Sequence, residues 1–124
     1  MYTDEILKKI DPKILDGEYI FCSFKNSIYG DYLHLMPIFS FQEDEGLTLI
    51  ILKEHADKNK IQYENTFKCI SLGFNSSLTS VGLTATLSSK LAESGVSANM
   101  AAGYFHDHLF VPSKSAEKAM KILL

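Results

Sequence analysis

The sequence predicts an α+β protein in which two related units share 124 residues. Three observations lead to this prediction. The length suits one body rather than two independent domains, because a separate core is hard to sustain much below ~60 residues. Short apolar runs of strand type alternate with segments of helical periodicity. The same order of elements also recurs, in reduced form, in the first half. We therefore expect two pseudo-repeats of one unit.

The second half shows the order most clearly. Residues 67–74 are an apolar run that predicts a strand. Residues 77–94 follow as a helix, with Gly95 as its C-terminal stop. The side chains that recur near the 3.6-residue period in this helix are Val81, Leu83, Thr84, Leu87 and Leu91. A strand followed by a long amphipathic helix opens this unit.

Two further strands and a helix complete the second half. Residues 95–105 and 108–112 are apolar runs joined by a short polar turn, which predicts a hairpin that ends at Pro112. A final helix begins at Ser113 or Ser115. Its apolar positions are Ala116, Ala119, Met120 and Leu123.

The first half repeats this plan with one reduction. Residues 18–25 predict a strand, and residues 37–42 and 47–53 predict a hairpin around the sequence "EDEG". A short helix follows at 54–60. Where the second half has its long helix, this half has only residues 26–36, "NSIYGDYLHLM".

A strand-helix-strand-strand-helix unit builds the ferredoxin-like fold, an antiparallel sheet with helices on one face. Each half is one strand short of the full βαββαβ pattern. We therefore expect each to borrow an edge strand from the other or to pair sheets across the join. The predicted units are residues 1–62 and 63–124, which together form one compact body.

Composition limits the partners. The formal net charge is −3 and the lysines are scattered, so the sequence predicts no binding to nucleic acid or to an anionic membrane surface. No apolar run approaches the ~20 residues of a membrane helix, and the first ten residues do not resemble a secretory signal. A cytoplasmic location is expected. Cys22 and Cys69 lie inside apolar runs, which is typical of buried, reduced thiols.

Three long segments of the chain resemble the ACT-domain superfamily, and in particular small bacterial proteins with two tandem ACT-like units. These segments are "EDEGLTLII" at 43–51, "NSSLTSVGLTATLSSKLAESGVSAN" at 75–99 and "AGYFHDHLFVP" at 102–112. The resemblance implies a regulatory or sensor protein that binds a small molecule, in particular an amino acid, without a cofactor and without catalysis. It also implies a homodimer or a larger homo-oligomer, as does the excess of apolar residues.

Polar residues converge at one end of the predicted second sheet. The loop after the first strand holds Asn75, Ser76 and Ser77 as N-cap candidates, and the hairpin turn at the same end holds His106, Asp107 and His108. Adjacent strands make Phe74 or Asn75 the expected neighbour of His108. Helix-start N–H groups suit a carboxylate, and Asp107 suits an ammonium group. Together they predict a binding site for an amino-acid-like ligand.

Other interpretations stay open. If related ends of the two units share a seam, Glu45 and Thr48 complete the pocket. The histidine pair alternatively binds a metal, although a third protein ligand is not evident and no native metal is predicted. The alternative from another class of function is a purely structural module, in which this end of the sheet only stabilises an oligomer. Tyr104 and Phe105 are expected to be packing residues.

Overall fold

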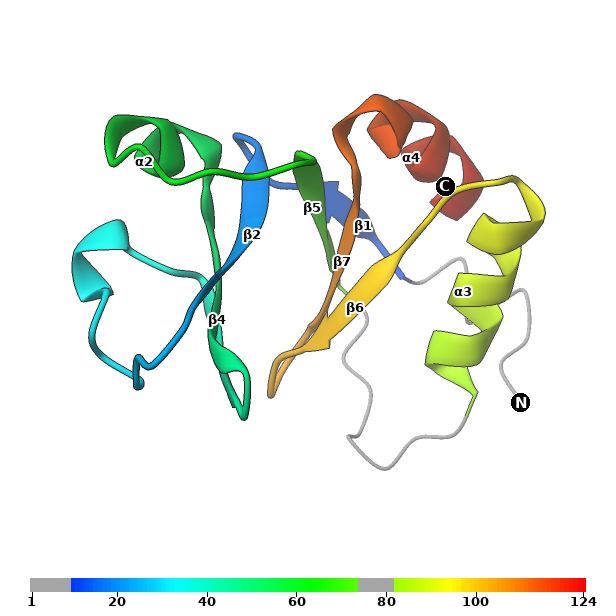
Figure 1. The fold of residues 1–124 in the computed structure, drawn as a ribbon. Coiled ribbons are helices and arrows are strands. Elements are labelled where there is room, and N and C mark those ends of the chain that lie inside the picture. Colours follow the sequence, from blue (N-terminus) through cyan, green and yellow to red (C-terminus); the bar gives the residue numbers. More distant parts are fainter. Residues whose placement is uncertain (1–9, 74–81) are drawn as a thin grey trace. The chain divides into compact units, whose positions relative to one another are not determined.

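The computed structural model describes residues 10–73 and 82–124 (Figure 1). It groups the chain into two compact units. The middle unit is Gly17–Thr66, and the split unit is Phe67–Leu124 together with the described residues before Gly17. Residues 10–16 thus group with the C-terminal half, whereas the sequence places them in the N-terminal unit.

Four antiparallel strands form the sheet of the split unit. They are β1 (Pro12–Ile14), β5 (Phe67–Leu72), β6 (Asn99–Ala102) and β7 (Asp107–Pro112). Their order is β1-β5-β7-β6, so the first and third strands of the strand-helix-strand-strand unit, β5 and β7, are adjacent at its centre. The fourth strand that the sequence lacks in this half is β1, an element that the sequence pattern did not predict. The fold is ferredoxin-like, with its edge strand taken from the start of the chain.

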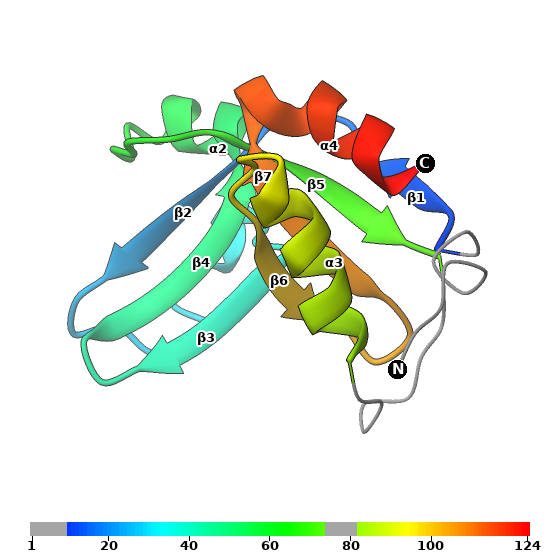
Figure 2. The same cartoon turned by 90° about the vertical axis from the view of Figure 1, so that its right-hand side faces the viewer.

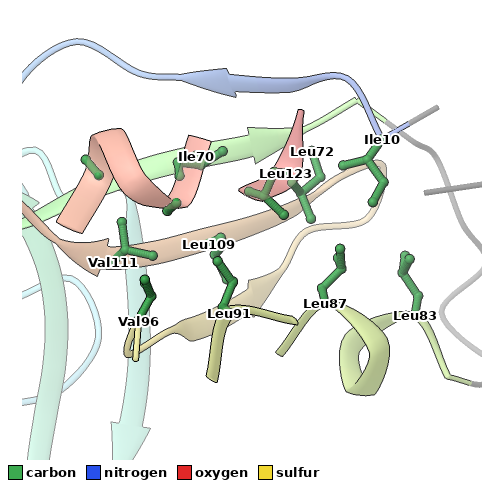
Figure 3. Close-up of a cluster of buried hydrophobic side chains, with 12 residues drawn as sticks. Ile10, Ile70, Leu72, Leu83, Leu87, Leu91, Val96, Leu109, Val111 and Leu123 are labelled. Carbon is green, nitrogen blue, oxygen red and sulfur yellow. The ribbon is translucent and has the colours of Figure 1, made fainter. Parts of the chain in front are cut away.

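Both helices of the split unit lie on one face of this sheet (Figure 2). They are α3 (Leu83–Glu93) and α4 (Ala116–Leu123), and the 3-10 turn η2 (Ser113–Ser115) leads into α4. Figure 3 shows leucines of α3 pointing toward side chains of the sheet. The buried core comprises Ile10, Ile70, Leu72, Leu83, Leu87, Leu91, Val96, Leu109, Val111, Ala116, Ala119 and Leu123. The predicted burial of Leu83, Leu87 and Leu91 is confirmed, and Thr84 is exposed.

The helix α3 is shorter than predicted. It begins at Leu83 rather than at residue 77, because Gly82 has φ 97° and breaks the helical path. The Thr86 side chain then donates a hydrogen bond to the Gly82 carbonyl at 2.7 Å. Asn75, Ser76 and Ser77, the predicted N-cap residues, lie outside the described residues.

The β6–β7 hairpin is confirmed, but its turn lies elsewhere than predicted. The Gly103 N–H donates to the His106 carbonyl at 2.8 Å, so the tip is residues 103–106 and Asp107 already belongs to β7. Tyr104 and Phe105 were expected to pack, yet they are 77% and 63% exposed. The prediction that they pack is wrong because both residues lie in the turn itself, beyond the end of the strand pair.

The sheet of the middle unit has three strands, of which two form a hairpin and the third pairs with that hairpin. They are β2 (Tyr19–Phe24), β3 (Phe39–Glu43) and β4 (Gly46–Leu52), all antiparallel, with β4 between β3 and β2. The short helix α2 (Lys53–Lys58) and the 3-10 turn η1 (Leu33–Leu35) cover one face. The core on that face comprises Ile20, Leu35, Leu47, Leu49, Ile51 and Ala56. The predicted strand, hairpin and short helix of the first half are confirmed.

Side-chain bonds fix the irregular parts of the middle unit. His55 on α2 bonds the Leu35 carbonyl through Nδ1 at 3.1 Å, which holds η1 against the helix. Asp57 receives a hydrogen bond from the Tyr63 hydroxyl at 2.7 Å and pairs with the Lys53 ammonium at 2.9 Å. Within residues 10–73 and 82–124, no helix is long and apolar enough to span a membrane.

Candidate functional site

The predicted site lies at one end of the split-unit sheet. The end of β5, the start of α3 and the β6–β7 turn all lie there (Figures 1 and 2). The register places Ser71 opposite His108, and not Phe74 or Asn75 as expected. The convergence of these elements at one sheet end is as the sequence predicts, although the pairing is shifted.

Strand alternation separates the acid from the second histidine. Asp107 shares its strand face with Leu109 and Val111, which are buried under the helices. His108 projects from the opposite face, and its imidazole lies over Gly103, where a Cβ would be only 3.2 Å from Cε1. The side chains of Asp107 and His108 therefore leave opposite faces of the sheet at its end.

The surroundings of Asp107 differ from those of His106. Its side chain is half-buried, and it makes no hydrogen bond or ion pair with any residue in the described ranges. A half-buried carboxylate has lost part of its hydration, so a hydrogen bond from a charged donor stabilises it. His106 is exposed at the tip and has no comparable environment.

A second carboxylate, which the sequence did not indicate, lies at the same sheet end. Asp11 precedes β1 with φ 48°, a conformation that costs energy for a residue other than glycine. The Gly73 N–H donates to its carbonyl at 3.2 Å, and a Cβ on Gly73 would lie 3.1 Å from its Oδ2. Asp11 forms a long, exposed ion pair with Lys13 at 3.7 Å. The local sequence around Asp11 shows only an aspartate before Pro12. It does not indicate that the following residues pair with β5.

Glu45 and Thr48 belong to the middle unit. Glu45 is exposed at the β3–β4 turn. The Thr48 hydroxyl donates a hydrogen bond to the Glu43 carboxylate across this hairpin, so it is already engaged. Thr48 is therefore positioned by its own hairpin, and a ligand would have to compete with Glu43 for it.

The described histidine, cysteine and acidic residues do not favour metal binding or nucleophilic catalysis. Among the described residues, no three His, Cys, Asp or Glu side chains gather closely enough to hold a metal ion. Burial raises the pKa of Cys22 and of Cys69 to about 11, so each thiol stays protonated at neutral pH. Neither cysteine has the thiolate character of an activated nucleophile.

Comparison with known proteins agrees with this fold. A Vibrio cholerae protein of unknown function, described as a "possible transport protein", is 44% identical and has a TM-score of 0.88. The match covers 96% of this chain and 91% of that one. An Agrobacterium tumefaciens protein is 20% identical with a TM-score of 0.73, over 90% and 84% of the two chains.

More distant structures share the fold alone. The ligand-free regulatory subunit of Thermus thermophilus aspartate kinase is 10% identical, with a TM-score of 0.62 over 93% of this chain and 95% of that subunit. A search of curated proteins finds no match to the sequence. Two profiles of the ACT domain match the chain, one at residues 3–68 and the other at residues 62–124. The chain therefore belongs to the ACT-domain family and consists of two tandem ACT-type domains.

Proposed function

We propose that this protein is a cytoplasmic, non-catalytic regulator that binds a small molecule, and that its ligand is an amino acid. The observation that carries the proposal is the half-buried Asp107 carboxylate, which has no partner among the described residues. It lies on the helix face, at the sheet end where β5 runs out and α3 begins. An amino acid brings an ammonium group that matches such a carboxylate.

The remaining groups divide according to the sheet geometry. The segment with Asn75, Ser76 and Ser77 follows β5 at this end, and we propose that it supplies donors for the ligand carboxylate. His106 is proposed as a peripheral contact. His108 becomes a secondary member of the site, because it projects from the other face of the sheet. Glu45 and Thr48 belong to the middle unit, where Thr48 is bonded to Glu43, and the proposed site does not depend on them.

Family membership supports the regulatory part of the proposal. The aspartate kinase subunit whose fold this chain shares is a regulatory one.

The test is a thermal-shift screen of the twenty amino acids against the wild-type protein and the Asp107→Asn variant. A ligand that binds only the folded state at 100 times its Kd stabilises by about 2.7 kcal/mol. Asp107→Asn removes a charge-assisted bond of about 1.5 to 3 kcal/mol, so the Kd should rise roughly 10- to 150-fold. The melting temperature without ligand should change little.

A matched control keeps the test specific. Asp16→Asn makes the same change at an exposed carboxylate in the same unit and should leave affinity unchanged. If no amino acid raises the melting temperature, the ligand class is wrong. If a ligand is found and Asp107→Asn binds it with wild-type affinity, the site is wrong.

A further inference from the structure

A row of polar side chains crosses the face of the split-unit sheet that lies away from its helices. Lys13 on β1 is opposite Ser71 on β5, and Ser71 is opposite His108 on β7. Opposite residues of antiparallel strands project to the same face, with their Cβ atoms roughly 5 Å apart. The strand neighbours Ile70 and Leu109 are buried in the core under the helices, so the polar row projects the other way. These three residues are called the polar row below.

Two members of the polar row are half-buried and have donor groups to offer. Within residues 10–73 and 82–124, neither the Ser71 hydroxyl nor the His108 imidazole makes a hydrogen bond or an ion pair. On the next strand, β6, the small residue Ala101 lies opposite His108, and the imidazole lies against Gly103. A hydroxyl and an imidazole N–H can each donate to a ligand oxygen. The row therefore presents two neighbouring donors that no described residue uses.

The third member of the polar row brings a positive charge that is only weakly engaged. The Lys13 ammonium lies 3.7 Å from the Asp11 carboxylate, and the two side chains are 72% and 67% exposed. An ion pair of this length between exposed side chains contributes little, because water and salt screen it. The flexible stem of a lysine also lets its ammonium turn toward a new partner. An anion that Ser71 and His108 also bind therefore competes well with Asp11 for Lys13.

We propose that the polar row binds a small oxyanion, namely the phosphate or carboxylate group of a metabolite. Lys13 supplies the charge, and the Ser71 hydroxyl and the His108 N–H donate to the anion oxygens. Catalysis by Ser71 is disfavoured, because its hydroxyl makes no hydrogen bond to His108, the geometry that activates a serine. This site is separate from Asp107, whose carboxylate lies on the helix face and suits a cation. The proposal therefore does not rest on the amino-acid site.

The test titrates the 124-residue protein with sodium phosphate and, separately, with sodium acetate, while NMR follows the backbone amide signals. Sodium chloride at matched ionic strength is the control for screening. Phosphate or acetate should shift the signals of Ser71 and His108 along a curve that saturates at millimolar concentrations. Chloride should give no such saturation.

Three variants assign the binding to the polar row. Lys13→Met removes the charge and keeps most of the stem, so the Kd for the anion should rise roughly 10-fold or more. Ser71→Ala removes one neutral donor and should raise the Kd by a smaller factor. Lys118→Met makes the same charge change at an exposed lysine on α4, on the helix side, and should leave the Kd unchanged. Both lysines are exposed, so their variants should keep the wild-type melting temperature without ligand.

The outcomes separate the kinds of anion from non-specific attraction. Tighter binding of phosphate identifies a phosphorylated metabolite as the ligand class, and tighter binding of acetate identifies a carboxylic acid; either result supports the site. Three results would each overturn the proposal: shifts that chloride reproduces, a wild-type Kd in Lys13→Met, or an equal loss in Lys13→Met and Lys118→Met. The last of these would mean that only the net charge of the protein attracts the anion. Lys13→Met alone decides the question if circular dichroism shows that Ser71→Ala does not fold.

Discussion

Replacing Gly46 by alanine should destabilise the middle unit far more than its small size suggests. Gly46 opens β4 with φ +152°, a value that side-chain-bearing residues rarely adopt. An added Cβ would also lie 2.7 Å from the Phe24 carbonyl oxygen and 3.1 Å from Ser23 Oγ. The carbonyl belongs to β2, which is paired with β4 along its whole length, so it cannot move aside without disturbing the ladder.

The size of the effect follows from two separate costs. The positive φ alone costs about 1 to 2 kcal/mol for an alanine. The clash with a fixed backbone atom adds about 1 to 3 kcal/mol, as in other overpacked sites. Gly46→Ala should therefore lower the free energy of unfolding by about 2 to 5 kcal/mol, measured by urea denaturation followed by circular dichroism.

Gly30 provides the matched control in the same unit. Its φ is +99°, and an added Cβ would have no atom within 4 Å. Gly30→Ala should therefore show only the conformational cost, about 1 to 2 kcal/mol. If both variants lose the same stability, the close approach of Gly46 to β2 is not as described and the reasoning fails.

The other predictions concern titration, reactivity and fragments. The hydrogen bond from Tyr63 lowers the pKa of Asp57 from its ordinary value of 3.8, so the stabilisation is present above the unfolded-state pKa and lost as pH falls through the folded one. In urea titrations, Asp57→Asn should be less stable than the wild type at neutral pH, and the gap should close below pH 3.8; a constant gap would contradict this. Burial should make both thiols react slowly with a disulfide reagent, and the fully buried Cys69 more slowly than Cys22; equal native rates would be the contrary result. The fragment 64–124 should show no cooperative melting, because it lacks β1; a folded monomeric fragment would refute this.

Local patterns were enough to predict most strands and helices. The apolar run around Ile70, the β6–β7 hairpin and the last helix each appear in the structure near the expected residues. These elements are recognisable because their side-chain periodicity extends over several residues. The helix α3 was predicted too long because Ser and Thr before Gly82 resemble capping residues, and the φ of a glycine is not visible in a periodicity.

A borrowed edge strand was expected for the second half, but which residues form it could not be predicted. β1 has only three residues, and its partner Ile70 lies 56 positions beyond Ile14, so no local pattern identifies it. The candidate site stays a prediction, and the register shows only that Ser71 at the end of β5 lies opposite His108. Asp107 and His108 point to opposite faces because β7 begins at Asp107. The sequence alone does not show where the hairpin turn ends and the strand begins.

The split of one unit by another has a consequence for the order of folding. β1 precedes the middle unit in the chain but pairs with β5, which follows it, and closing a loop of roughly 50 residues costs about 3.5 kcal/mol of chain entropy beyond a constant term. Most contacts of the middle unit are nearer in sequence, so we expect it to fold first and to shorten the loop that β1 must close. Strand β1 is then expected to pair late, although it is made before the middle unit, and the Leu15 N–H then donates to the Cys69 carbonyl at 2.9 Å.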